Sequence, residues 1–286
     1  MPNFITKYIE NKQLQKSGHT LIELASRGDL WSVNRLLAFP GIRLNQKDDD
    51  GRTALILAVW MGHNDVVKAL LAAPNILVNE QDKNGYSALM IAAWKGNAKI
   101  LNLLLSADGI EINQVDKNGF TALMIATWGD HPYIVHLLVA DPRIIVNQPR
   151  ISTRTAALAM AASRGYTQIV ETLLKVCSID DIFQKNIYGD TALTVADRNK
   201  HDKIVSLLNK NIELQVREVR HCLAQNLNLS EKDWGPVDVI FSYLYKGEEF
   251  LSLFNKLRVS QPSNKIPASL PPSIEKTAKK SSSGNP

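Results

Sequence analysis

Few side chains in this chain of 286 residues have the types and spacing that catalysis requires. Its six histidines are scattered, and only His221 stands next to a cysteine, Cys222. Adjacent residues on a helix point about 100° apart, so this pair does not form a nucleophile–base dyad. The sequence has no glycine-rich phosphate or dinucleotide loop and no His-Glu-x-x-His motif. We therefore expect no enzyme activity, no catalytic residue and no cofactor.

The remaining reactive groups have structural explanations. Cys177 and Cys222 are the only two cysteines, and their spacing indicates neither a disulfide framework nor a zinc site. The acidic runs at 48–50 and 180–181 fall in expected turns, where we predict no metal site.

Three tryptophans recur at a fixed interval. Trp60, Trp94 and Trp128 stand in AVWMGH, AAWKGN and ATWGDH, 34 residues apart each time. Tryptophan is a residue type enriched at the energetic centre of protein interfaces. Such regular spacing requires a repeated structural unit that positions the side chains.

A sixfold internal repeat supplies this unit. Alignment on the last alanine of a T-A-L-x-x-A core gives steps of 33, 34, 34, 35 and 35 residues, so the first unit is predicted to be one residue short. Each core leads into a second apolar run, such as DVVKALL or KILNLLL. The aligned alanines are Ala25, Ala58, Ala92, Ala126, Ala161 and Ala196, and an asparagine recurs at Asn45, Asn79, Asn113 and Asn147.

This pattern resembles the ankyrin repeat, whose consensus is roughly D-x-x-G-x-T-P-L-H-x-A-A-x-x-G-H, followed by V-x-x-L-L and V-N. Six consecutive matches cover about residues 17–210, after an N-terminal segment at 1–16. The resemblance implies an all-α solenoid of about six helix-turn-helix units, stabilised by contacts between neighbouring units. The proline and histidine of T-P-L-H are absent from every unit.

Turn and cap residues agree with this fold. Turn glycines at 51, 85, 119 and 189 stand where a positive φ is needed. Hydroxyl side chains at 53, 87, 121 and 191 are placed to cap the next helix. Arg154 and Lys200 replace expected glycines, and we predict a break in the regularity of the superhelix near 148–156. His63 and His131 are expected to brace the turn that follows the first helix.

The resemblance also implies where a partner binds. In the ankyrin pattern, the two residues before the helix-A glycine and the residue after the turn glycine project onto the concave face. The predicted protein-binding residues are Arg52, Trp60, Met61, Tyr86, Trp94, Lys95, Phe120, Trp128, Arg154 and Arg164. The alternative is that the tryptophans pack between repeats and that the basic residues form a solvated rim.

After Asn211 the period stops. Residues 211–258 are predicted to form about three helices, which either cap the last repeat or recruit a second protein. Within them PVDVIFSYL, residues 236–244, faintly resembles the F-box core. This resemblance implies an alternative function, a substrate adaptor for a ubiquitin ligase. An enzyme with an unrecognised site in the same helices is the third alternative.

Charge and composition restrict the remaining classes. The tail at 259–286 is expected to be disordered, and its four lysines and one glutamate supply +3 of the net charge of +5. The nearly neutral remainder offers no nucleic-acid-binding face. No apolar run is long enough to span a membrane, and no secretory signal is evident. We expect a soluble, cytoplasmic monomer. The loops and tail resemble effectors that intracellular bacteria inject, which would place the protein in the host cytoplasm.

Overall fold

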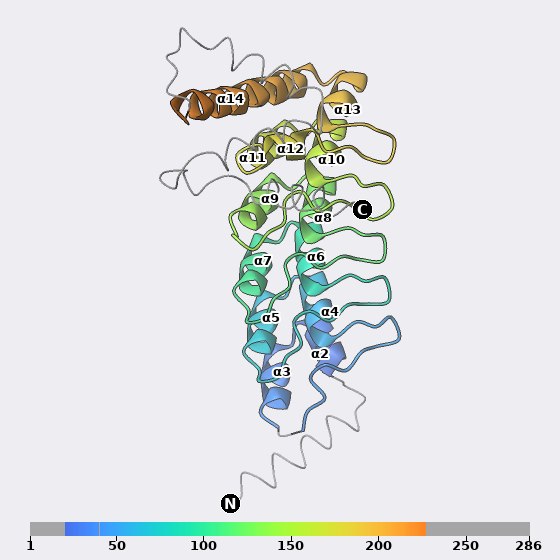
Figure 1. Cartoon of the computed structure of the whole chain (residues 1–286). Helices are drawn as coiled ribbons and strands as arrows, with labels where there is room; N and C mark the ends of the chain where they lie inside the picture. The colour runs from blue at the N-terminus through green and yellow to red at the C-terminus, as the bar shows by residue number, and fades with distance from the viewer. Residues whose placement is uncertain (1–20, 40, 227–286) are drawn as a thin grey trace, which may run out of the picture. The chain divides into compact units, whose positions relative to one another are not determined.

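The computed structural model of the chain describes residues 21–39 and 41–226, which are helical apart from loops and one isolated antiparallel bridge between Gln81 and Ser87. Figure 1 shows the helices of the repeats stacked in two columns, each helix contacting its counterpart in the next repeat. The inner column contains α2 (Leu21–Arg27), α4 (Ala54–Met61), α6 (Ala88–Lys95), α8 (Ala122–Trp128), α10 (Ala157–Arg164) and α13 (Ala192–Arg198). The outer column contains α3 (Leu30–Leu37), α5 (Asn64–Leu71), α7 (Ala98–Leu105), α9 (Pro132–Val139) and α11 (Thr167–Leu173). The short helix α12 (Ile179–Ile182) and the long helix α14 (Asp202–Asn226) follow.

The two columns differ in burial because their helices have different apolar patterns. The first six residues of α4, Ala54–Val59, are all buried, since the helix is apolar around its whole circumference. The outer helix α5 buries only Val66, Val67 and Leu70, which form one stripe along its axis. The inner helices α4, α6, α8 and α10 are therefore the core, and only their last residues reach the surface.

Side-chain caps fix the start of each regular inner helix, as predicted. The Thr53 hydroxyl accepts a hydrogen bond from the Ile56 amide, and Thr121 caps Met124 in the same way. Ser87 and Thr191 occupy the same position in their repeats. The fifth repeat differs, because Ala156 stands at this position and offers no side-chain acceptor.

The loops between repeats are tied to each other by their backbones. Gly85 has φ +87°, and a Cβ atom there would lie 2.7 Å from the Lys117 nitrogen of the next repeat. Nearby, the Lys117 amide donates to the Asn84 carbonyl. Only glycine fits this conformation and this close approach without strain.

The recurring asparagines form a second tie. The Asn79 amide group donates to the Gly109 carbonyl, and its oxygen accepts from the Glu111 amide. Asn45 and Asn113 make the corresponding pair of bonds to the loops of the repeats that follow them. The recurrence of asparagine is therefore explained by one side chain that both donates to and accepts from the next loop.

The predicted register of the first repeat is wrong by one residue. The His63 amide donates to the Ala58 carbonyl at the end of α4, and in the first repeat the corresponding bond joins Asp29 to Leu24. Gly28 and Gly62 both have positive φ at the end of the inner helix. Leu24 is thus the counterpart of Ala58, and the first unit is not short. The alignment failed because a leucine stands where the other repeats have alanine.

The turn at 150–155 is irregular, at the place where the sequence predicts a break in superhelix regularity. The turn bond from the Arg150 amide reaches Thr155, whereas the equivalent bond of the preceding repeat runs from Asp116 to Phe120 and spans one residue fewer. Arg154 takes the place of the turn glycine and adopts φ +54°. The extra residue accounts for the longer step into this repeat.

Helix α14 runs unbroken from Asp202 to Asn226, so the predicted domain boundary between 210 and 211 falls inside a helix. The remaining helices predicted up to residue 258, the F-box-like stretch at 236–244 and the tail at 259–286 lie outside the described residues.

Candidate recognition surface

The three tryptophans lie at the ends of three successive inner helices. Trp60, Trp94 and Trp128 stand in the last turns of α4, α6 and α8, next to side chains that are fully buried. They nevertheless expose 38%, 47% and 50% of their area. Tryptophan is mostly buried in proteins, so three half-exposed rings on one side of the repeats are unusual.

The first two rings contact each other across the repeat boundary. The centroids of Trp60 and Trp94 are 5.1 Å apart with the planes tilted by 46°. The Lys95 Nζ atom lies 4.6 Å from the centroid of Trp60 and 5.2 Å from that of Trp94. The two alternatives posed from the sequence are therefore compatible, because these rings pack between repeats and still present area to solvent.

A second cluster surrounds the third tryptophan. Phe120 and Trp128 meet edge to face, with centroids 6.2 Å apart. The Arg164 Cζ atom, from the next inner helix, lies 3.5 Å from the Trp128 centroid. The Arg150 Cζ atom lies 4.3 Å from the centroid of Phe120. Each cation is held by the ring quadrupole, an interaction worth about 0.5–1 kcal/mol at exposed sites.

We call the seven residues of these two clusters the aromatic surface. They are Trp60, Trp94, Lys95, Phe120, Trp128, Arg150 and Arg164.

Four other residues predicted from the sequence lie beside this surface and differ in availability. Met61 is exposed and Tyr86 is half-buried, where burial and the nearby Asp116 raise the pKa of the phenol. Arg52 is held by Asp48 and Asp50, with N–O distances of 2.8 and 2.7 Å.

Arg154 is exposed in the turn and contacts no aromatic ring of the described residues. The residue that stacks is Arg150, which sequence reasoning missed. Arg150 stands at the turn position occupied by Asp82 and Asp116 in earlier repeats. The replacement of an acidic by a basic residue at this position is the sequence feature that could have identified Arg150.

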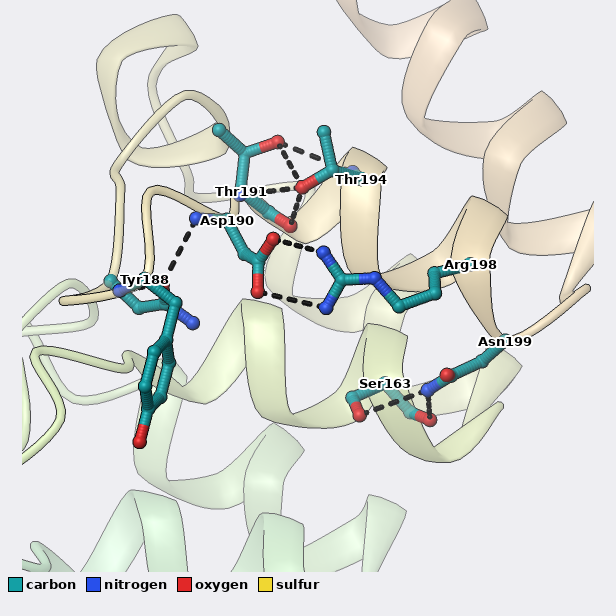
Figure 2. Close-up of polar contacts among 8 residues, drawn as sticks. Ser163, Tyr188, Asp190, Thr191, Thr194, Arg198 and Asn199 are labelled. Atoms are coloured by element: carbon teal, nitrogen blue, oxygen red, sulfur yellow. Dashed lines mark hydrogen bonds and ion pairs between the residues drawn. The ribbon is translucent and has the colours of Figure 1, made fainter.

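The aromatic surface ends in the later repeats, where the same positions hold polar side chains. In the sixth repeat, Asp190 and Arg198 replace the pair formed by Phe120 and Trp128 in the fourth. Figure 2 shows them joined by two parallel contacts, with Asn199 donating to the backbone and hydroxyl oxygens of Ser163. Ser163 itself stands at the tryptophan position of the fifth repeat, so the aromatic rings are confined to repeats two to four.

Comparison with known proteins identifies the fold. A family model described as "Ankyrin repeats (3 copies)" matches residues 21–116, 77–150 and 140–218. This chain belongs to the ankyrin-repeat family. The ankyrin solenoid predicted from the sequence is thereby confirmed, and the family is a general protein-interaction fold. None of the curated proteins matches the chain significantly.

Solved ankyrin structures resemble the repeats closely. The ankyrin-repeat protein EF0377 is 26% identical, with a TM-score of 0.62, 66% of this chain covered and 96% of that one. An ankyrin-repeat domain from Acinetobacter baumannii AYE is also 26% identical, with a TM-score of 0.62 and coverage of 67% and 96%. The ankyrin-repeat domain of Bcl-3 shares the fold at 22% identity, with a TM-score of 0.63 and coverage of 68% and 86%.

The histidines of the ankyrin turns brace neighbouring repeats, as predicted for His63 and His131. Their Nε2 atoms lie 3.0 Å from the Ser26 carbonyl oxygen and 2.8 Å from that of Trp94. His201 contacts the Ser163 carbonyl in the same way. A carbonyl oxygen can only accept, so each ring donates through Nε2 and holds the end of the previous inner helix.

The thiol of Cys177 is buried among the described residues. Burial, followed by the charge of Asp181, raises the pKa of the Cys177 thiol to about 12, which leaves it protonated at neutral pH. Among the described residues, no three His, Cys, Asp or Glu side chains gather into a group that could hold a metal ion. None of the helices between residues 21 and 226 combines the length and apolar character needed to cross a bilayer.

Proposed function

We propose that this chain is a non-catalytic binding module that captures a partner protein on the concave ankyrin face through the aromatic surface. The observation that carries the proposal is the run of three half-exposed tryptophans at equivalent positions of successive inner helices. The fold does not require aromatic side chains there, because the first, fifth and sixth repeats place Ser26, Ser163 and Arg198 at the same position. Partner binding accounts for the exposed half of each ring.

The exposed area of the three tryptophan rings is large enough to determine the affinity for a partner. A buried tryptophan covers about 150–250 Å², so a half-exposed ring leaves about 100 Å² for a partner. At about 25 cal/mol per Å², covering that area contributes about 2 kcal/mol, which corresponds to roughly a thirtyfold change in the dissociation constant. Removing all three rings should therefore abolish capture.

The test compares two sets of substitutions in affinity capture from eukaryotic cell lysate. The first variant replaces Trp60, Trp94 and Trp128 with alanine. The matched control replaces Trp31 of α3 and Tyr133 of α9, outer-helix residues that are 66% and 61% exposed. Trp31 also lies under a cation, because the Arg35 Cζ atom is 4.9 Å from its ring centroid.

The proposal expects partners to be lost from the triple variant and kept by the control. Thermal melting of both variants separates recognition from packing, since the contact between Trp60 and Trp94 is worth about 0.5–1.5 kcal/mol to the fold. Unchanged capture by a folded triple variant would refute the proposal.

The effector and adaptor hypotheses each have a direct test. If the protein is an injected effector of the host cytoplasm, deletion of 259–286 should abolish translocation while the repeats melt as before. If residues 211–258 recruit a ubiquitin-ligase adaptor, the full chain should bind the adaptor, and substitutions within 236–244 should remove that binding. Size-exclusion chromatography with light scattering tests the expectation of a monomer.

A further inference from the structure

The aromatic surface carries three basic side chains that no carboxylate neutralises. Lys95, Arg150 and Arg164 each stack on a tryptophan or phenylalanine ring. Within the described part of the chain, none of the three takes part in an ion pair. They come from the third and fifth repeats and flank the three tryptophans.

Three arginines elsewhere on the repeats are neutralised by carboxylates. Arg52 is paired with Asp48, Arg143 with Asp141, and Arg198 with Asp190. The Arg198 pair is especially informative, because it occupies the positions held by Phe120 and Trp128 two repeats earlier. The chain thus neutralises these three arginines with carboxylates and leaves the cations of the aromatic surface without an ion pair.

Stacking on a ring orients a cation without neutralising its charge. A guanidinium that lies on an aromatic face keeps its N–H groups in its own plane, where they remain available to a carboxylate. Fixing the side chain in advance also reduces the entropy lost when such a bond forms. Lys95, Arg150 and Arg164 are therefore preorganised donors that lie against aromatic rings. Arg150 already donates through Nε to the Asn118 carbonyl, and Arg164 donates through one terminal nitrogen to the Tyr166 hydroxyl, so their other N–H groups are the ones available to a carboxylate.

We propose that the partner presents an acidic peptide segment. Its aspartate or glutamate carboxylates bind Lys95, Arg150 and Arg164, and its apolar side chains cover the tryptophan rings between them. This inference rests on the proposed function and specifies the chemistry of the partner. The segment extends over repeats two to five, because those repeats supply all seven residues of the surface.

A nucleic acid would fit this surface less well, although it also combines negative charge with groups that stack on aromatic rings. A phosphate backbone requires a continuous basic track. The aromatic surface itself holds three separate cations without an ion pair, and Arg52, which would extend the track, is already held by Asp48 and Asp50. Separate carboxylates among apolar side chains match better the three cations that lie between aromatic rings on this surface.

The first experiment selects binders from an unbiased displayed peptide library on the full chain. The inference expects the selected peptides to be enriched in aspartate and glutamate, with apolar residues between the acids. Affinity of a selected peptide should fall as salt is raised, because surface charge pairs are screened.

The second experiment measures that peptide against two triple variants of equal net charge. One replaces Lys95, Arg150 and Arg164 with glutamine and should weaken binding about tenfold or more. The control replaces three exposed lysines away from the surface, Lys68, Lys99 and Lys175, and should change affinity less than about twofold.

The outcomes separate the inference from the proposed function. Selected peptides without acidic enrichment, or equal affinity of both triple variants, would overturn the acidic partner and leave protein binding intact. Competition by a single-stranded oligothymidylate at concentrations similar to those of the peptide would also overturn it. Failure to select any peptide, together with unchanged lysate capture by the tryptophan variant, would overturn protein binding on this face.

Discussion

The asparagine that recurs every 34 residues makes a stability prediction that the structure defines closely. Asn79 links its repeat to the following loop with two hydrogen bonds, 2.7 Å to the Gly109 carbonyl and 2.9 Å from the Glu111 amide. The Asn79→Ala substitution removes both and leaves the fold of each single repeat intact. Its effect should therefore be a loss of coupling between the second and third repeats.

The magnitude follows from the two bonds. Each neutral hydrogen bond contributes about 1 kcal/mol net, and water can reach the freed groups because this loop is at the surface. We expect the free energy of unfolding to fall by about 1–2 kcal/mol. In a solenoid, stability is a sum of repeat and interface contributions, so the loss should concentrate at this interface.

Urea unfolding and amide hydrogen exchange provide the assay. With a slope of about 2 kcal/mol per molar urea, the midpoint should fall by about 0.5–1 M. Protection of the Glu111 amide should drop more than that of amides in the fifth and sixth repeats. Asn102→Ala is the control, because Asn102 is exposed in α7 and its side chain makes no hydrogen bond to the described residues. If Asn79→Ala unfolds at the same urea concentration as this control, the asparagine tie does not couple the repeats.

Two further predictions concern the loops. Gly85→Ala should destabilise the protein by about 2 kcal/mol more than Gly109→Ala in urea unfolding. Both glycines have positive φ, but only at Gly85 would a Cβ atom lie within 3 Å of another backbone atom. Equal losses in the free energy of unfolding would contradict this prediction. Hydrogen bonds from Arg198 lower the pKa of Asp190, so this pair stabilises the fold at pH 6 and loses its contribution as the pH falls below about 4. Asp190→Asn should therefore be less stable than the wild type at pH 6 and approach it at pH 3 in denaturant unfolding, and a constant difference would show that the carboxylate does not act through its charge.

Much of the fold could be predicted because its signals are local. A hydroxyl before an apolar run, as at Thr53, caps the helix that it begins, and a turn glycine such as Gly85 adopts the backbone angle that its turn requires. These markers repeat, so six weak signals reinforce one another. The predicted register of the first repeat was wrong because the alignment depended on one local residue type, the alanine, which is replaced by Leu24 in this repeat. Only the backbone hydrogen bonds reveal the correct alignment.

The aromatic surface was only partly predictable. Periodicity placed Trp60, Trp94 and Trp128 on one side of the repeats, and the structure locates them at the ends of successive inner helices. Periodicity did not distinguish Arg52, which is paired within its own turn, from Arg164, which stacks on a ring of the preceding repeat. It also selected Arg154 where the structure brings Arg150 to Phe120.

The sequence by itself therefore determined the ankyrin solenoid, its helix caps and the position of the tryptophans, because each depends on residues a few positions apart. Only the tertiary structure decided which cations meet aromatic rings and which meet carboxylates. Lys95 reaches Trp60 because two inner helices stack side by side, and that distance is set by the packing of the alanines and leucines beneath them. The charge left unpaired on the aromatic surface is thus a property of the assembled repeats.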